Sequence, residues 1–415
     1  MAKVDKEFDI VLWGATGFTG ELVAEYLLAQ YGVDGGLRWA LAGRNQGKLD
    51  ALKDRLVARD AQASGLPTLL ADSHDLASLK AMASRTQVVC TTVGPYLAYG
   101  LDLVEACIDE GAHYCDLTGE TPFIRKVMDK WHDKAEAAGV KIVTSCGFDS
   151  IPSDLGCLVV QEHAIAAHER PLDSVKYYLG KTRGGMSGGT IASMLGIIEQ
   201  ASDPELRRVL LDAYALNPKG AARGPDKYDQ QDVRWDDDIN GWTGPFVMAG
   251  INTRIVRRSN ALMGFRYGEQ FSYNEVQSFP KGKKGKKMAS RMRLGIGLFL
   301  GLAALAPTRW LLKKTVLPAP GTGPTREERE NGCFYVTFVG KGSNAKGEDV
   351  SVKGEVTSDL DPGYAGTARM LAEAAVCLAK DEHLPDSAGI LTPSVAMGMP
   401  LVERLRAKGM TFSAA

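Results

Sequence analysis

Residues 8–30 read FDIVLWGATGFTGELVAEYLLAQ and decide the fold of the N-terminal half. Residues 8–13 are apolar except for Asp9, which is typical of a parallel strand covered on both faces. Three glycines follow at G-x-x-G-x-x-G spacing, and residues 21–30 then have the composition of a helix. Helix starts carry unpaired amides and a partial positive charge, so a diphosphate binds there where no side chain blocks it. The predicted contacts are Gly14, Ala15, Thr16, Gly17, Phe18, Thr19 and Gly20.

The motif is an extended variant of the G-x-G-x-x-G fingerprint, and a turn used only for packing is the alternative. A second strand at residues 38–42 lies at the distance of a βαβ dinucleotide-binding unit, which favours binding. It ends in Ala42-Gly43-Arg44-Asn45. An acidic residue here binds the ribose hydroxyls of NAD, whereas a cation suits the 2′-phosphate of NADP. We therefore predict NADP(H), with Arg44 on the phosphate and Lys48 as a second contact. The alternative for Arg44 is a solvated surface arginine.

Further strand and helix repeats continue to residue 145. Strands are expected at 68–71, 87–92, 113–117 and 141–145, with a helix that starts at Thr121. In an open parallel sheet the ligand lies across the carboxyl ends of the strands, so the residues after each strand are candidates. Asp72 is predicted on the adenine side, and Gly94, Pro95 and Tyr96 nearer the nicotinamide. For Tyr96, a ring packed under the loop is the alternative.

The composition excludes several classes of protein. The chain has 415 residues, with 49 lysines and arginines against 50 aspartates and glutamates, so no net charge attracts nucleic acid. Seven cysteines are scattered without a C-x-x-C pair or a histidine at zinc-ligand spacing, which predicts no metal site and a reduced compartment. The N-terminus lacks a secretory signal pattern, which predicts a cytoplasmic protein.

The second half predicts an α+β domain that begins with the turn and helix start at 146–156. A strand is expected at 174–180, and an antiparallel hairpin at 333–341 and 349–358. Residues 184–190, GGMSGGT, are a second glycine-rich helix start, which either holds an anion or only forms a turn. Residues 246–262 are predicted as a helix with Arg254, Arg257 and Arg258 on one cationic face. Two small-residue helices are expected at 366–379 and 394–407.

Residues 281–314 combine basic residues with the uncharged run 294–308. This run of 15 residues is shorter than the roughly 20 that a spanning helix needs. Basic residues on both sides of an apolar stretch, with Trp310 at one border, are typical of a segment that lies on a membrane surface. The alternative is a buried helix of the second domain or of a homodimer interface, with a solvated basic loop. The membrane interpretation predicts a cytoplasmic protein that is peripheral at the inner membrane surface.

Several motifs together resemble the saccharopine dehydrogenase-like oxidoreductases, and more narrowly their trans-acting enoyl reductase branch. They are GATGFTG (14–20), LAGR (41–44), TTVGPY (91–96), HYCDLTGE (113–120), CGFDSIPSDLG (146–156), MSGGT (186–190), RRSNAL (257–262) and GILTPSVAMG (389–398). The resemblance implies an NADP-dependent reductase of α/β class, with a Rossmann parallel sheet, an inserted domain with a mixed or antiparallel sheet, and C-terminal helices that return to the Rossmann domain. In this branch, the enzyme saturates a double bond on a polyketide or long acyl chain presented by a partner synthase.

These observations predict three segments. Residues 1–150 form the NADP-binding domain, residues 151–360 a domain for substrate binding or dimerisation, and residues 361–415 the returning helices. Hydride transfer also requires a proton donor near the substrate. Tyr96 is the first candidate, followed by Tyr99, Asp149 and His113.

Three classes of function stay open from the sequence. The first is a reductase of an enoyl or other lipid acyl substrate. The second is a reductase of imines or amino acids, which would need a polar, arginine-lined pocket. The third is a non-catalytic NADP-binding protein that docks on a membrane or a partner.

Overall fold

The computed structural model describes residues 6–33, 35–184, 188–315 and 323–415. The chain divides into two compact units. Of the described residues, unit 1 contains 6–148, 323–325 and 363–405, and unit 2 contains 149–315, 326–362 and 406–415. The predicted boundaries at 150 and 360 lie two residues from the crossings at 148 and 362. The last ten residues return to unit 2, which was not predicted.

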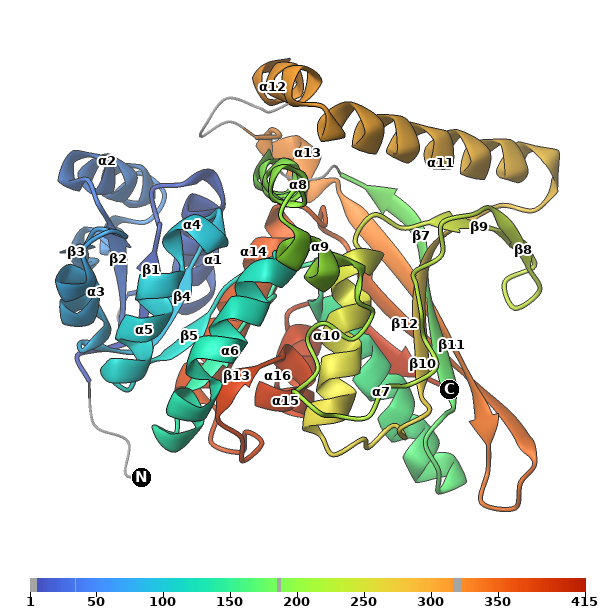
Figure 1. Ribbon diagram of the computed structural model, residues 1–415. Helices are drawn as coiled ribbons and strands as arrows, with labels where there is room; N and C mark the ends of the chain where they lie inside the picture. The colour runs from blue at the N-terminus through green and yellow to red at the C-terminus, as the bar shows by residue number, and fades with distance from the viewer. Residues whose placement is uncertain (1–5, 34, 185–187, 316–322) are drawn as a thin grey trace. The chain divides into compact units, whose positions relative to one another are not determined.

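Unit 1 is built on a seven-stranded parallel sheet with the order β13-β6-β5-β4-β1-β2-β3 (Figure 1). All six residues of β1 are buried, because β1 pairs with β2 on one side and β4 on the other. Asp9 interrupts the apolar run, and its carboxylate pairs with Arg38 and Lys380. The strands are β1 (Phe8–Trp13), β2 (Trp39–Gly43), β3 (Thr68–Leu70), β4 (Thr86–Thr91), β5 (His113–Cys115), β6 (Lys141–Val143) and β13 (Gly389–Leu391).

The helices of unit 1 begin where the local sequence offers a cap. The Asn45 side chain accepts the amide of Lys48 at the start of α2, and Asp75 accepts the amides of Ala77 and Ser78 at the start of α3. The helices are α1 (Phe18–Tyr31), α2 (Gln46–Val57), η1 (Ala61–Gly65), α3 (Leu76–Ala83), α4 (Tyr96–Tyr99), α5 (Leu101–Asp109), α6 (Thr121–Ala137), α14 (Ala365–Lys380), α15 (Pro393–Ala396) and α16 (Gly398–Ala407).

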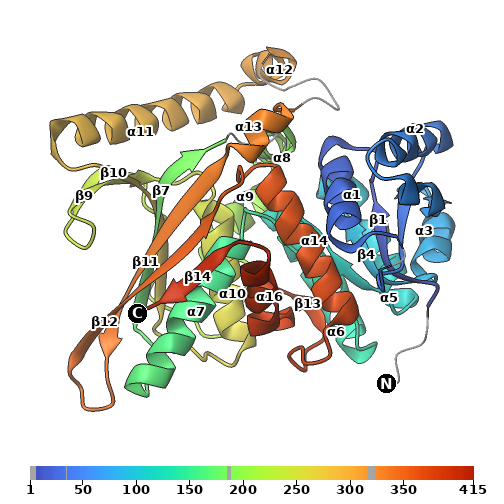
Figure 2. The ribbon, with the colours of Figure 1, turned by 180° about the vertical axis from the view of Figure 1, so that it is seen from behind.

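The C-terminal helices pack back on unit 1, as predicted (Figure 2). Glu373 of α14 is fully buried and accepts the hydroxyls of Tyr26 and Tyr31 of α1. Arg404 of α16 pairs with the same carboxylate. β13, which was not predicted as a strand, joins the sheet beside β6. The bonds from Tyr26 and Tyr31 to Glu373 join residues more than 340 positions apart, so no local pattern signals them.

Unit 2 is built on a mixed sheet with the order β14-β12-β11-β7-β10-β9-β8. β7 and β10 are parallel, and the other pairs are antiparallel. The predicted hairpin is β11 paired with β12, with Phe334 opposite Ser358. The strands are β7 (Ser174–Arg183), β8 (Arg234–Asp236), β9 (Gly241–Pro245), β10 (Ser272–Phe279), β11 (Cys333–Ser343), β12 (Asp349–Ser358) and β14 (Thr411–Ala414).

Helices cover this sheet closely. A Cβ at Gly156 of α7 would lie 2.4 Å from the ring of Phe338 on β11, so the glycine allows the helix to approach the strands. The predicted helix 246–262 begins at Ala249, three residues late, because β9 ends at Pro245. The helices are α7 (Ile151–His168), α8 (Gly188–Gln200), α9 (Pro204–Leu211), α10 (Ala249–Leu262), α11 (Gly282–Ala304), α12 (Ala306–Thr315) and α13 (Arg326–Glu330).

Candidate functional site

The turn after β1 has the geometry of a diphosphate site. Gly14 has a φ of +85°, and a Cβ there would lie 2.5 Å from Cγ2 of Val93. A Cβ at Gly20 would lie 2.2 Å from the carbonyl oxygen of Gly14. Around Gly17, the nearest described atom to an added Cβ is that same oxygen at 3.3 Å, and no described side chain fills the space. Gly14 forms the turn, and Gly17 leaves the outer side of the turn open. Gly20 allows α1 to pack close to the backbone of Gly14.

The first amides of α1 follow this turn directly. Gly17 caps the helix with extended backbone and without a side-chain hydrogen bond. The amide of Glu21 donates to the carbonyl of Gly17 at 2.8 Å, so the amides of Thr19 and Gly20 have no partner inside the helix. Amides in this position bind phosphate oxygens. Of the other predicted contacts, Ala15 is buried, and Thr16, Phe18 and Thr19 are half-buried.

Arg44 follows β2 at the same edge of the sheet and is exposed. Among the described residues, no hydrogen bond or ion pair holds its guanidinium group. Lys48 is exposed in the first turn of α2. A Cβ at Gly43 would lie 3.8 Å from Cγ2 of Thr16, which places the end of β2 beside the glycine turn. Two exposed cations at this position suit the 2′-phosphate of NADP.

Asp72 follows β3 and is exposed. Its Oδ1 accepts the amide of His74 at 2.9 Å, and its own amide donates to Oγ of Ser78 at 3.0 Å. This is the turn-forming role that aspartate often has. The predicted adenine contact of Asp72 stays a prediction.

The turn after β4 is joined to the glycine turn. The hydroxyl of Thr92 donates to the carbonyl of Gly14 at 3.1 Å. Gly94 and Pro95 are exposed. The buried carboxylate of Glu120 accepts the amides of Tyr96 and Leu97, both at 3.0 Å, and so holds the start of α4.

Tyr96 packs inside unit 1. Its side chain is 4% exposed, its ring lies 5.8 Å from that of Phe123, and its hydroxyl donates to the carbonyl of Thr91 at 3.4 Å. Burial raises the pKa of Tyr96 well above its usual range. The alternative interpretation, a ring packed under the loop, describes this position. That Tyr96 donates the proton stays a prediction, and its burial argues against it.

The other predicted donors lie in different places. Tyr99 is half-buried, and its ring packs edge-on against His74 with centroids 5.5 Å apart. His113 is the first residue of β5, and its Nδ1 accepts the amide of Lys141, the first residue of β6. These are the amino ends of the strands, whereas ligands lie at the carboxyl ends. The donor role of His113 stays a prediction, and its position argues against it.

Asp149 follows β6 by six residues, on the carboxyl side of that strand. Its carboxyl group is half-buried and has no hydrogen bond or ion pair with any described residue. Burial without a compensating cation raises the pKa of Asp149 to about 7. A carboxyl group that is protonated near neutral pH can donate a proton.

Two acidic residues of this edge were missed from the sequence. Glu120 holds α4, and buried Asp116 accepts the amides of Thr118 and Ser145 and the hydroxyl of Tyr114. Burial raises the pKa of Asp116 to about 7. Asp116 stands directly after β5 and Glu120 lies in the loop that follows it, so the rule that singled out Asp72 after β3 could have found them.

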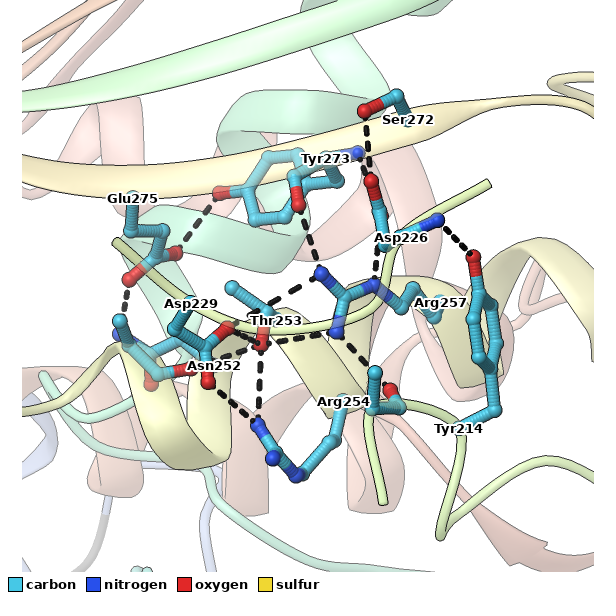
Figure 3. A network of polar contacts seen from close by, with 12 residues as sticks. Tyr214, Asp226, Asp229, Asn252, Thr253, Arg254, Arg257, Ser272, Tyr273 and Glu275 are labelled. Carbon is cyan, nitrogen blue, oxygen red and sulfur yellow. Dashed lines mark hydrogen bonds and ion pairs between the residues drawn. The ribbon is translucent and has the colours of Figure 1, made fainter. Parts of the chain in front are cut away.

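The predicted cationic face of α10 lies inside unit 2 (Figure 3). Nε of Arg257 bonds to Asp226 at 2.8 Å, and Nη1 of Arg254 bonds to Asp229 at 2.9 Å. Arg258 is also buried and donates to the carbonyl of Leu216 at 2.6 Å. The helix and its cationic face were predicted, but the partners of the arginines were not, because the aspartates come from an irregular segment whose position the sequence does not show.

Two further predictions concern anions and metals. In the glycine-rich start 184–190, residues 185–187 lie outside the described residues. Within the described part of the chain, no group of three or more His, Cys, Asp or Glu side chains is placed to hold a metal ion.

Comparison with known proteins agrees with this geometry. A family model, the saccharopine dehydrogenase NADP binding domain, matches residues 10–143, which contain the glycine turn and Arg44. A Mycobacterium tuberculosis protein named "Putative trans-acting enoyl reductase" is 42% identical over 426 residues, covering 99% of this chain and 98% of its own. The trans-acting enoyl reductase of Mycobacterium ulcerans is 38% identical over 429 residues, covering 100% of this chain and 99% of its own.

A solved structure has a similar fold over nearly the whole chain. It is apo saccharopine dehydrogenase (L-Glu forming) from Saccharomyces cerevisiae, with a TM-score of 0.55 and 13% identity, covering 98% of this chain and 99% of that one. The two mycobacterial relatives match from end to end at much higher identity. This chain therefore belongs to the saccharopine dehydrogenase-like oxidoreductases, in the branch of the trans-acting enoyl reductases, and its cofactor is NADP(H).

Proposed function

We propose that this chain uses NADPH to saturate a carbon–carbon double bond conjugated to the thioester carbonyl of an acyl chain that a separate synthase presents. The observation that carries the proposal is the glycine turn beside Arg44. The outer side of this turn is open at Gly17, and the guanidinium group of Arg44 has no hydrogen bond or ion pair with a described residue. The relatives named trans-acting enoyl reductases support the substrate class and the separate synthase.

The residues of this edge fit the cofactor. The amides of Thr19 and Gly20 would hold the diphosphate, and Arg44 and Lys48 would hold the 2′-phosphate. Glu120 would not touch the cofactor but would position the turn at Gly94, because its carboxylate holds the first two amides of α4. When bound, NADPH supplies the hydride.

Addition of hydride to the β-carbon leaves an electron pair shared between the α-carbon and the carbonyl oxygen, so a proton must reach the α-carbon. We assign this proton to Asp149. Its carboxyl group is half-buried, its raised pKa of about 7 keeps part of it protonated at neutral pH, and no described residue competes for it. Tyr99, whose ring is held by His74, is the second candidate.

The buried arginines bear on the rival reductase of imines or amino acids. That function was expected to need an arginine-lined pocket, but Arg254 and Arg257 are both committed to aspartates inside unit 2. The described residues therefore offer no specific observation that favours it.

The test compares substrates with one enzyme preparation. NADPH oxidation is followed with a trans-2-enoyl thioester, with the matched saturated thioester, and with a 2-oxo acid plus an amine. We expect oxidation with the enoyl thioester alone, and mass spectrometry should find one deuterium at the β-carbon when the nicotinamide C4 is deuterated. Oxidation with the oxo acid and amine alone would overturn the substrate class. Binding of NADPH without oxidation by any of them would overturn the enzymatic function.

A further inference from the structure

Helix α11 lies at one side of unit 2, where it contacts β9, β10, α8 and α12 (Figures 1 and 2). Gly285, Ala289 and Ala303 are its buried residues, and Ile296 and Phe299 are half-buried. These positions fall on one face at helical spacing. The small residues allow α11 to lie close to β9 and β10, and the remaining residues of the helix face away.

Large apolar side chains of α11 and α12 are exposed at positions where surface helices usually carry polar residues. Leu294, Leu298 and Leu305 are 72%, 61% and 60% exposed, and Trp310 of α12 is 63% exposed. Five more large apolar side chains of the pair are exposed, namely Met288, Met292, Leu300, Leu302 and Leu311. Single exposed leucines are common, but nine exposed large apolar side chains within residues 288–311 mark an interaction surface.

The same segment is strongly basic. Residues 281–314 contain ten lysines and arginines and no aspartate or glutamate. Lys283, Lys284 and Lys287 are exposed on the first half of α11, before the apolar half. Lys314 lies over the ring of Trp310 at 5.2 Å, at the other border of the apolar part. Along α11, a basic half is thus followed by an apolar half.

We propose that α11 and α12 form a docking surface for a membrane that contains anionic lipids. The lysines would meet the headgroups, and the leucines and Trp310 would enter the boundary between headgroups and acyl chains. The apolar residues stand on the convex outside of a helix, a shape that fits a deformable lipid surface without a matching groove. The protein would then be peripheral at the membrane.

The same segment does not resemble a membrane span. Among the described residues, no single helix is long and apolar enough to cross a bilayer. α11 and α12 reach such a composition only as a pair, and the pair is bent by 114°. A bent pair with basic residues at one end suits a position in the interface.

The test measures co-sedimentation of the full chain with vesicles of phosphatidylcholine, with and without phosphatidylglycerol. We expect binding to the anionic vesicles that weakens as salt rises. Each lysine contributes about fivefold, so Lys283→Gln/Lys284→Gln/Lys287→Gln should lose about a hundredfold. Leu294→Ser/Leu298→Ser should lose at least tenfold per leucine, because burial of each apolar side chain is lost.

Matched variants control for nonspecific charge and apolar surface. Lys126→Gln/Lys227→Gln/Lys346→Gln and Leu70→Ser/Leu211→Ser alter exposed residues elsewhere and should leave vesicle binding unchanged. All substituted side chains are exposed, and circular dichroism should show intact folding in every variant. The experiment uses neither cofactor nor substrate, so its result is independent of the proposed reductase function.

Three outcomes would overturn the proposal. The first is equal binding of wild type and variants to anionic vesicles. The second is that the chain does not bind vesicles but binds an acidic acyl carrier protein, and that the triple lysine variant loses this binding. The third is that the chain forms a dimer, and that the leucine substitutions dissociate this dimer but leave vesicle binding unchanged.

Discussion

At the scale of the residue, Arg44 decides between the two nicotinamide cofactors. Its guanidinium has no partner among the described residues and is free to meet a phosphate. We expect Arg44→Ala to weaken NADPH binding by about 1–3 kcal/mol and to leave NADH binding almost unchanged. Calorimetry with both cofactors measures this, with Lys53→Ala on the same helix as a control. Equal losses for both cofactors would contradict the role of Arg44.

Substitutions at two glycines of the turn should affect different properties, cofactor binding at Gly17 and stability at Gly20. Gly17 has φ −79° and an open outer side, so Gly17→Ala should fold with a loss of about 1 kcal/mol or less while both cofactors bind more weakly. Gly20→Ala places a methyl group 2.2 Å from a carbonyl oxygen and should cost about 1–3 kcal/mol of stability. Thermal unfolding and cofactor titration of both variants measure the difference. A Gly17→Ala protein that binds NADPH like wild type would show that the diphosphate lies elsewhere.

Asp149 predicts a pH dependence of the reaction. Because its pKa is raised to about 7, the carboxyl group carries its proton below that pH and loses it above. The rate should therefore fall as pH rises through about 7. Asp149→Asn should lower kcat by about 10²–10⁴-fold and remove this fall, whereas Tyr99→Phe should keep it. A profile of kcat/KM against pH decides the point, and an unchanged profile in Asp149→Asn would exclude the residue as donor.

At the scale of the element, α10 and β10 are joined by a buried polar network (Figure 3). Glu275 of β10 accepts Nδ2 of Asn252 at 2.8 Å and the hydroxyl of Tyr273 at 2.8 Å. Arg257 of α10 donates to the carbonyl of Tyr273 at 2.9 Å. Every partner is provided by the protein, so this network fixes how the helix lies on the sheet.

Glu275 predicts how stability depends on pH. Burial raises its pKa to about 7, so between pH 4.5 and 7 the folded protein binds a proton that the unfolded chain releases. The free energy of unfolding should therefore fall as pH rises across this window, by about 3 kcal/mol for this group. Glu275→Gln mimics the neutral acid and should flatten the slope, whereas Glu269→Gln, at an exposed carboxylate, should not. Denaturant unfolding at several pH values measures the slope; an equal slope in wild type and Glu275→Gln would contradict the assignment.

At the scale of the whole molecule, the predicted cofactor site and the proposed membrane surface lie in different units. The residues that would hold the cofactor are in unit 1, and the proposed membrane surface is in unit 2. Hydrogen exchange of the full chain should therefore show two separate footprints. We expect NADPH to protect amides in 14–20, 44–48 and 92–97, and anionic vesicles to protect amides in 282–315. At a hundred times its Kd, NADPH should stabilise its unit by about 2.7 kcal/mol. Protection of unit 2 alone by NADPH would contradict the cofactor site.

The sequence by itself determined the parts of this protein that depend on neighbouring residues. The glycine turn, Arg44 and Lys48 lie within one βαβ unit, so spacing and residue type were enough to predict the cofactor and the edge of the sheet that binds it. The hairpin of β11 and β12 was found for the same reason, because alternation and a short connection are local signals.

The tertiary structure alone decided what depends on residues far apart in the chain. β13 and β14 are too short to carry a pattern, and they are strands because their neighbours offer hydrogen-bonding edges. The sequence places Arg254 and Arg257 on one cationic face, and only the fold shows that aspartates 25 and 31 positions away pair with them inside unit 2. Only the tertiary structure shows that the ring of Tyr96, the first candidate for proton donor, is buried in unit 1. Burial and pairing arise when the chain folds, and no local pattern encodes them.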